Sequence, residues 1–133
     1  MASVLLDTHI LIWWLIDPTR LTPPPWKMLR QLEQQGQPLA VSAISLWEAA
    51  LLVQRGRIEV DAPLETWIGE LETHPLLTVV PITARIAAES VLLDEAFPKD
   101  PADRLIVATA RCHGLRLVTA DERIRAWGKV PLA

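Results

Sequence analysis

Four short apolar runs alternate with longer segments of helical pattern along this chain of 133 residues. The runs cover residues 4–6, 39–42, 78–82 and 116–119. A continuous apolar run is typical of a strand that is covered on both faces. No hairpin signal such as Asn-Gly joins two runs. We therefore expect an α/β fold in which a parallel sheet carries helices on both faces.

Capping and helix-breaking residues set the expected helix boundaries. Thr8 begins a helix that Asp17-Pro18 ends, and Thr22 followed by Pro23 begins a second, which runs to Gln35. With their capping residues, the other helices are expected over residues 45–56, 64–71, 83–95, 100–114 and 121–127. No internal repeat, linker or low-complexity segment divides the chain, so a single domain over residues 1–133 is expected.

Composition narrows the classes of function. The chain carries 13 basic and 16 acidic residues, a net charge of −3. It therefore lacks the broad basic surface of proteins that bind nucleic acid through many phosphates, and any such contact must be local. The longest apolar run, Ile10–Ile16, is far shorter than the roughly 20 residues that span a bilayer. No membrane segment or secretory signal is recognisable, and we expect a cytoplasmic protein.

Four acidic residues lie where apolar runs end or helices begin. Asp7 directly follows the first run, Glu48 lies beyond the second, Asp103 is at the start of an apolar helix, and Asp121 follows the last run. If the runs form one parallel sheet, these carboxylates gather at its carboxyl edge, where open α/β sheets bind ligands.

Each acid also has a structural explanation when it is taken alone. Ser45 and Glu48 match a capping box, Asp103 falls in a first helical turn, and Asp121 is a plausible N-cap. Each role contributes about 1 kcal/mol. Asp7 has no capping role as obvious as these. The joint pattern therefore carries more information than any single residue.

Carboxylates that share a pocket need a cation. At an effective dielectric near 20, two carboxylates about 4 Å apart repel by about 4 kcal/mol, so the group must bind protons or a metal ion. Oxygen ligands of this kind suit Mg²⁺ or Mn²⁺. Such an ion lowers the pKa of a water nucleophile and neutralises charge on a phosphate, which favours phosphodiester hydrolysis.

Other chemistries fit the sequence less well. The five glycines form no phosphate-binding loop, and Ser42 and Ser45 have no nearby base. His9, His74 and His113 lack zinc-site spacing. His9 could orient a carboxylate or contact a phosphate, but a helix-start histidine without such a role is the simpler interpretation.

Four segments, taken in order, resemble the motifs of PIN-domain proteins of the VapC toxin type. They are Leu5-Leu6-Asp7-Thr8-His9, Val41 to Glu48, Asp100 to Ile106, and Leu117 to Asp121. Each piece is weakly specific, whereas four in order over nearly the whole chain make a specific match. The resemblance implies a three-layer α/β/α sandwich and a Mg²⁺- or Mn²⁺-dependent endoribonuclease, the toxin of a toxin–antitoxin pair. It also implies an antitoxin partner and a homodimer.

The resemblance assigns roles to individual residues. Asp7, Glu48, Asp103 and Asp121 match the family's acidic quartet, with Asp7 and Asp103 as the expected direct metal ligands. Asp100 competes with Asp103, but its place before Pro101 better fits an N-cap. Other expected contributors are orienting hydroxyls and one arginine that pairs with an acid or faces the scissile phosphate: Thr8, Ser45, Thr119 and Arg104. One departure is Leu52, where similar toxins often carry a basic residue.

Two readings from other classes stay open. A receiver-like signalling domain also gathers acids at a parallel sheet edge, but it would need a phosphoacceptor aspartate on a middle strand and a lysine near the last one. A non-catalytic PIN-fold binding module is the other. Trp13 and Trp14 point about 100° apart on a helix, so one of them is expected to meet a partner.

Overall fold

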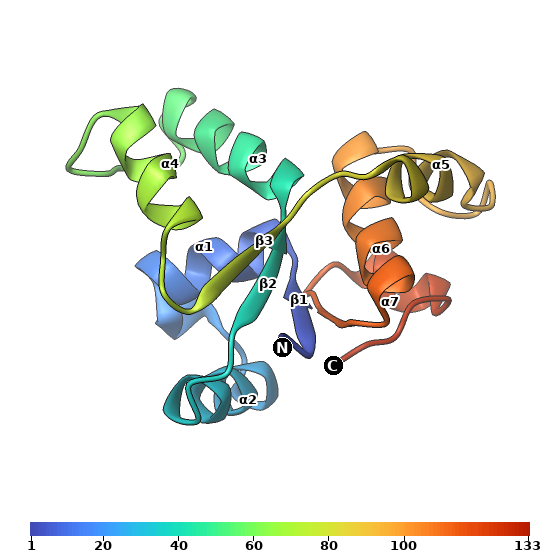
Figure 1. Ribbon diagram of the computed structural model, residues 1–133, viewed down its shortest axis with the longest axis horizontal. Helices are drawn as coiled ribbons and strands as arrows, with labels where there is room; N and C mark the ends of the chain where they lie inside the picture. The colour runs from blue at the N-terminus through green and yellow to red at the C-terminus, as the bar shows by residue number, and fades with distance from the viewer.

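The computed structural model describes all residues, 1–133, and has a four-stranded, all-parallel sheet. The strands lie in the order β3-β2-β1-β4 and span Val4–Leu6 (β1), Leu39–Ser42 (β2), Leu77–Val80 (β3) and Arg116–Val118 (β4). Helices cover both faces (Figure 1), which confirms the predicted α/β sandwich.

Seven α-helices and a short 3₁₀ helix connect the strands. They are α1 (Thr8–Ile16), η1 (Pro18–Arg20), α2 (Pro23–Gln34), α3 (Ala43–Gln54), α4 (Leu64–Glu72), α5 (Ala84–Leu92), α6 (Pro101–His113) and α7 (Glu122–Trp127). The longest, α6, has 13 residues, and none of them combines the length and apolarity required to cross a bilayer.

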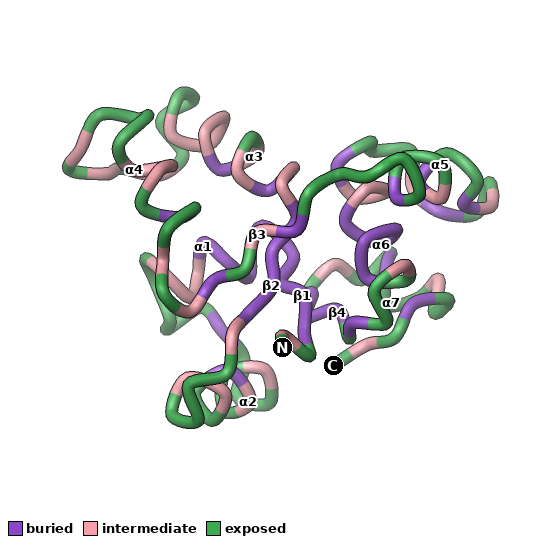
Figure 2. The backbone as a smooth tube through the Cα atoms, in the orientation of Figure 1, coloured by how far each residue is buried: buried purple, intermediate pink, exposed green.

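Alternate side chains of the central strand, β1, pack into two separate hydrophobic cores on opposite faces of the sheet. Val4 and Leu6 pack with α1 and α2, whereas Leu5 packs with α6 on the opposite face. All three side chains are fully buried. Figure 2 shows the buried segments concentrated along the strands and the helix faces that cover them. The continuous apolar run of β1 is thus explained by burial on both faces.

Several boundaries differ from the sequence-based prediction, those of β3 and α3 among them. β3 ends at Val80, because Pro81 has no N–H to donate to a neighbouring strand. α3 begins at Ala43 with Ser42 as its N-cap, whose hydroxyl accepts a hydrogen bond from the Ile44 N–H at 3.2 Å. The predicted capping box of Ser45 and Glu48 is therefore wrong, and both side chains are free for other contacts.

The topology places a crevice beside β1. The chain proceeds from β1 to β2 and β3 on one side and returns to add β4 on the other. Such a reversal of strand order is where open α/β sheets bind ligands, at the carboxyl ends of the strands. Asp7 follows β1 and Thr119 follows β4 at this edge.

Candidate active site

Asp7 is buried at the carboxyl end of the central strand, with only 3% of its surface exposed. Its Oδ1 accepts a hydrogen bond from the Thr8 N–H at 2.8 Å, so Asp7 is the N-cap of α1, contrary to the sequence-based expectation. Its Oδ2 accepts a bond from the Thr119 hydroxyl at 2.7 Å. A buried carboxylate requires such donors. Both are neutral, so the negative charge of Asp7 stays uncompensated by them.

His9 connects Asp7 to the loop after β4. Its Nε2 accepts a hydrogen bond from the Ala120 N–H at 2.9 Å, so that nitrogen holds no proton. The ring proton then lies on Nδ1, which is 3.6 Å from Asp7 Oδ2. Of the two roles considered for His9, the structure favours the one in which it orients a carboxylate.

Glu48 projects from α3 toward the start of α1. Its Oε1 accepts a hydrogen bond from the Thr8 hydroxyl at 2.5 Å. That hydroxyl has one proton, so in its 2.8 Å contact with the fully buried Ser45 hydroxyl it is the acceptor. Burial raises the pKa of Glu48, the Thr8 bond opposes this rise, and the charges of Asp7 and Asp100 add to it. The orienting roles expected of these hydroxyls are consistent with these contacts.

Asp103 lies in the first turn of α6 and faces the other acids. Burial raises its pKa to about 7, and the negative charges of Asp100, Asp7, Asp121 and Glu48 contribute to the rise. A carboxyl group in a helical first turn would ordinarily favour its charged form. Burial is the main cause of the opposite shift, and the repulsion from the four neighbouring carboxylates adds to it.

Asp121 is held by the arginine two residues later. It caps α7 by accepting the Arg123 N–H at 2.8 Å, and its Oδ2 pairs with Arg123 Nη2 at 3.0 Å. The same Nη2 is 3.5 Å from Asp103 Oδ2. The Arg123 guanidinium lowers the pKa of Asp121, against a smaller effect of burial. Sequence reasoning did not identify Arg123, although its spacing from Asp121 was a usable signal.

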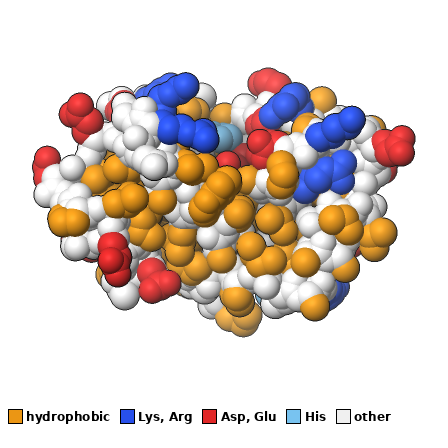
Figure 3. Space-filling view, turned by 90° about the horizontal axis from the view of Figure 1, so that it is seen from above, with side chains coloured by type: hydrophobic (Ala, Val, Ile, Leu, Met, Phe, Trp, Pro, Cys, Tyr) orange, Lys and Arg blue, Asp and Glu red, His pale blue; other side chains and the backbone are white.

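A pocket of about 220 Å³ opens over these side chains. It is lined by Asp7, Glu48, Asp103, Thr8, His9, Leu51, Leu52 and Arg55. In Figure 3 a hollow with acidic and histidine side chains lies between two groups of Lys and Arg side chains. Leu52, noted above as a departure from the family pattern, lines the pocket beside Arg55, which supplies a positive charge to the same wall.

The donor set of this pocket fits a hard divalent cation. Carboxylate oxygens are the ligands that Mg²⁺ and Mn²⁺ prefer. Burial, and to a smaller extent the neighbouring negative charges, raise the pKa values of Asp103 and Glu48, and a cation would balance those charges. As the side chains stand, no three of them converge closely enough to hold one ion. The residues thus match the cation in type and charge, and binding it would require their side chains to turn toward one point.

Asp100 and Arg104 have structural roles. Asp100 is the N-cap of α6 and accepts the Asp103 N–H at 3.1 Å.

The Arg104 guanidinium donates to five backbone carbonyls of the α5–α6 segment, those of Ser90, Leu93, Asp94, Phe97 and Pro98. It forms no ion pair. The expectation that Arg104 pairs with an acid or faces a phosphate is therefore wrong.

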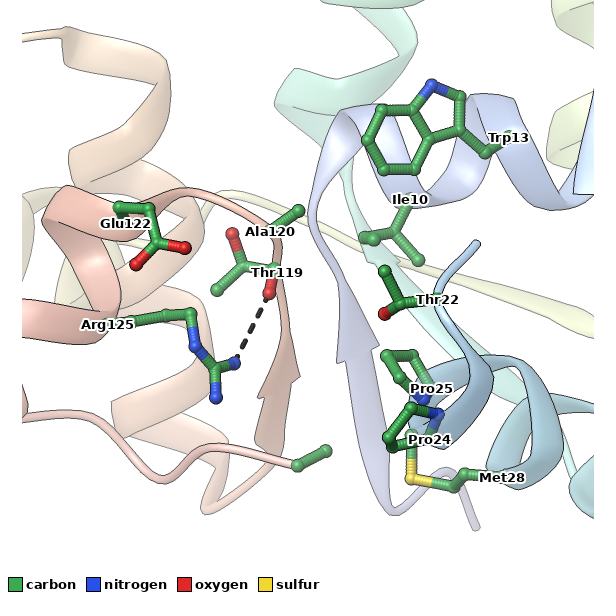
Figure 4. Close-up of a pocket in the computed structure, with 11 residues that line it drawn as sticks. Ile10, Trp13, Thr22, Pro24, Pro25, Met28, Thr119, Ala120, Glu122 and Arg125 are labelled. Carbon is green, nitrogen blue, oxygen red and sulfur yellow. Dashed lines mark hydrogen bonds between the residues drawn. The ribbon is translucent and has the colours of Figure 1, made fainter. Parts of the chain in front are cut away.

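A second hollow, of about 310 Å³, lies between α1, the start of α2 and the segment after β4 (Figure 4). Ile10 and Trp13 line one side, and Arg125 lies opposite, donating to the Thr119 carbonyl at 3.4 Å. Glu122 is the only acid in its lining. This hollow therefore lacks the donors for a cation, and the acidic pocket is the better candidate for chemistry.

Comparison with known proteins agrees with this assignment of the fold. A family model of the PIN domain matches residues 4–130. Ribonuclease VapC22 of Mycobacterium tuberculosis is 43% identical over 126 residues, which cover 95% of this chain and 92% of that protein.

Two solved structures are also similar along nearly their whole length. DNA-bound VapBC from Salmonella typhimurium has a TM-score of 0.70 at 19% identity, covering 100% of this chain and 98% of that chain. A toxin–antitoxin complex from Klebsiella pneumoniae has a TM-score of 0.65 at 24% identity, covering 98% and 97%. At these identities the two structures establish the fold alone.

Proposed function

The chain belongs to the PIN-domain family, as a protein of the VapC type, and from this premise we propose that it is a Mg²⁺- or Mn²⁺-dependent endoribonuclease. The predicted family is confirmed, and the receiver-like alternative is set aside. The observation that carries the proposal is that the carboxylates of Asp7, Glu48 and Asp103 line one pocket. Burial and the neighbouring negative charges there raise the pKa of Asp103 to about 7. Uncompensated carboxylates at a sheet edge are what a cation-dependent hydrolase of phosphodiesters needs.

We assign the four acids to one cation site. Asp7 and Asp103 are its direct ligands, because both line the pocket and the charge of Asp7 contributes to the raised pKa of Asp103. Glu48 and Asp121 complete the site directly or through water. A bound divalent cation would activate a water nucleophile and balance the charge that grows on the phosphate.

The surrounding residues prepare these ligands. Thr8 and Thr119 hold carboxylate oxygens through hydroxyl bonds of 2.5 Å and 2.7 Å. His9, with its Nδ1 toward Asp7, fixes the loop that carries Asp121. Partners of this kind orient metal ligands and keep their charge available to the ion.

RNA cleavage by the purified protein tests the activity. We expect cleavage of single-stranded RNA with Mg²⁺ or Mn²⁺, none in EDTA, and recovery when the cation is restored. Cleavage that continued in EDTA would contradict the cation dependence. A protein that bound the cation but never cut RNA would instead support the remaining alternative, a non-catalytic PIN-fold module.

We also propose two protein partners, an antitoxin and a second copy of this chain. The Klebsiella pneumoniae structure is a toxin–antitoxin complex, and the Salmonella typhimurium structure is a DNA-bound VapBC. An RNA substrate and a toxin role place the protein in the cytoplasm. Trp13 and Trp14 are both half-buried against the core, and the Trp14 indole donates to Glu33. Trp47 on α3 is the more exposed tryptophan, at 56%.

The surface around Trp47 supports the homodimer. A groove of about 690 Å³ runs between α3 and the start of α6, with Trp47, Leu51, Ile82 and Pro101 in its lining. Figure 3 shows hydrophobic side chains gathered beside the acidic hollow, and Ile82 in the groove lining is 41% exposed. Exposed apolar surface of this kind is typical of protein contacts. We expect light scattering to show a dimer and Trp47→Glu to show a monomer. A monomeric wild-type protein would contradict this assignment.

A further inference from the structure

Arg123 is the arginine that pairs with two acids of the site. Its Nη2 lies 3.0 Å from Asp121 Oδ2 and 3.5 Å from Asp103 Oδ2, and its Nε donates to Asp121 Oδ1 at 3.3 Å. Arg104 is bound to backbone carbonyls, and Arg111 pairs with Glu89. Arg123 is thus the residue whose position is set by the charge of the proposed cation ligands.

The ion pairs of Arg123 with Asp121 and Asp103 are weak enough to be exchanged. Its side chain is 64% exposed, and ion pairs at such sites are weak and screened by salt. One guanidinium also balances only part of the charge of two carboxylates. A guanidinium binds phosphate oxygens through two parallel N–H bonds at least as well as it binds a carboxylate. The free protein therefore holds a phosphate-binding group directly beside its acidic pocket.

We propose that Arg123 binds a phosphate of the RNA strand, and that in the free protein its guanidinium is ion-paired with Asp121 and Asp103 instead. It exchanges the two carboxylates for a phosphate oxygen once their charge is balanced by a divalent cation. This inference rests on the proposed function. It implies that Arg123 and the cation compete for the same oxygens, whereas Arg123 and the RNA cooperate.

Because of this competition, removing the charge of Arg123 should change the affinities for Mn²⁺ and for RNA in opposite directions. In Arg123→Gln without RNA, we expect Mn²⁺ to bind about two- to fivefold more tightly, because a competing exposed ion pair is gone. The same variant should bind RNA about tenfold more weakly, because a charged hydrogen bond to phosphate is lost. The slope of log affinity against log salt should fall by about 0.7, the value for one phosphate contact on a single strand.

The measurements need no catalysis. Mn²⁺ binding is followed by the electron paramagnetic resonance signal of the free ion, and RNA binding by the anisotropy of a labelled oligouridylate in Ca²⁺. Arg123→Lys should retain the salt slope and lose part of the RNA affinity. Arg111→Gln is the matched control, since Arg111 forms a similar ion pair with Glu89 at 3.0 Å near the other end of α6, and it should change neither affinity.

The outcomes separate the inference from the proposed function. Asp121 caps α7 through the Arg123 backbone N–H, which glutamine retains, so the variant should fold normally. If wild-type protein binds both probes and Arg123→Gln weakens both or neither, Arg123 serves only the local structure and the inference is overturned. If wild-type protein binds neither probe, the proposed function fails, and the inference fails with it.

Discussion

The carboxylates of Asp7 and Glu48 are held by hydroxyl groups, whereas those of Asp103 and Asp121 are held by a guanidinium. Thr119 donates to Asp7 and Thr8 donates to Glu48, at 2.7 Å and 2.5 Å. Neutral donors fix the direction of a carboxylate but leave its charge for a cation. A guanidinium supplies charge itself and can be displaced. We call Asp7 and Glu48 the fixed pair, because neutral donors set their geometry. We call Asp103 and Asp121 the variable pair, because their charge can be balanced either by Arg123 or by a cation.

The two pairs also differ in the elements that support them. The first pair is built on β1, α1 and α3, with the buried Ser45 behind it. In the second pair, Asp103 lies in the first turn of α6 and Asp121 is the N-cap of α7. Arg104 fixes the backbone that leads into α6, so the variability of the second pair is in its side chains.

The largest effect is expected from removing charge in the fixed pair. Asp7→Asn should lower kcat/KM for RNA cleavage by about 10³, as for loss of a group that stabilises charge in the transition state. Asp121→Asn should lower it by only about 10 to 100-fold, because Asp121 lies outside the pocket lining and acts on the site from its edge.

Cleavage of a fluorogenic RNA in saturating Mg²⁺ would measure both values. Asp94→Asn serves as the control, because Asp94 pairs with Lys129 and Trp127 away from the site. Equal losses in Asp7→Asn and Asp121→Asn would erase the proposed distinction between the two pairs.

An intermediate effect is expected from the hydroxyl that holds Glu48. Thr8→Val keeps the shape of the side chain but leaves a half-buried carboxylate without its donor, which should lower the free energy of unfolding by about 1–3 kcal/mol. The pKa of Glu48 should rise further, since the Thr8 bond now lowers it. Urea denaturation would measure the loss, with Thr73→Val as control because Thr73 bonds only to an exposed helix end. Equal stability in the two variants would contradict a supporting role for Thr8.

Local sequence signals predicted most of the fold. The strands were recognisable because burial on both faces makes them continuously apolar, and the caps Thr83, Asp100 and Asp121 were recognisable because they act within three residues. The capping box at Ser45 failed because Ser42, three residues earlier, caps the same helix and frees Ser45 for a contact with Thr8.

Contacts between distant segments could not be predicted in this way. The Thr119 and Asp7 side chains meet across 112 positions of sequence, and nothing local marks the pair. Arg104 follows Asp103 directly, so it was expected to act in the site, but its side chain leaves the pocket and serves the preceding loop. The sequence thus indicated the edge of the sheet at which these acids lie, and only the packing of the helices showed what holds each of them.

The smallest effect expected is a pH dependence of stability from the variable pair. The pKa of Asp103 is raised from 3.8 to about 7 by folding, so the folded protein binds this proton more tightly than the unfolded chain does. Its stabilising contribution is therefore complete below about pH 4 and is lost as the pH rises through about 7. In EDTA, the Tm of wild-type protein should fall relative to that of Asp103→Asn between pH 5 and pH 8.

A divalent cation should reverse this loss, because it favours the charged carboxylate that the folded protein otherwise resists. Mn²⁺ at pH 8 should raise the Tm of wild-type protein by several degrees and that of Asp103→Asn by less. In Arg123→Gln, Mn²⁺ should raise the Tm by more than it does in wild-type protein, because the competing guanidinium is absent. If Mn²⁺ raised the Tm of wild-type protein and Asp103→Asn equally, the ion would be binding without Asp103, and the variable pair would have no part in holding it.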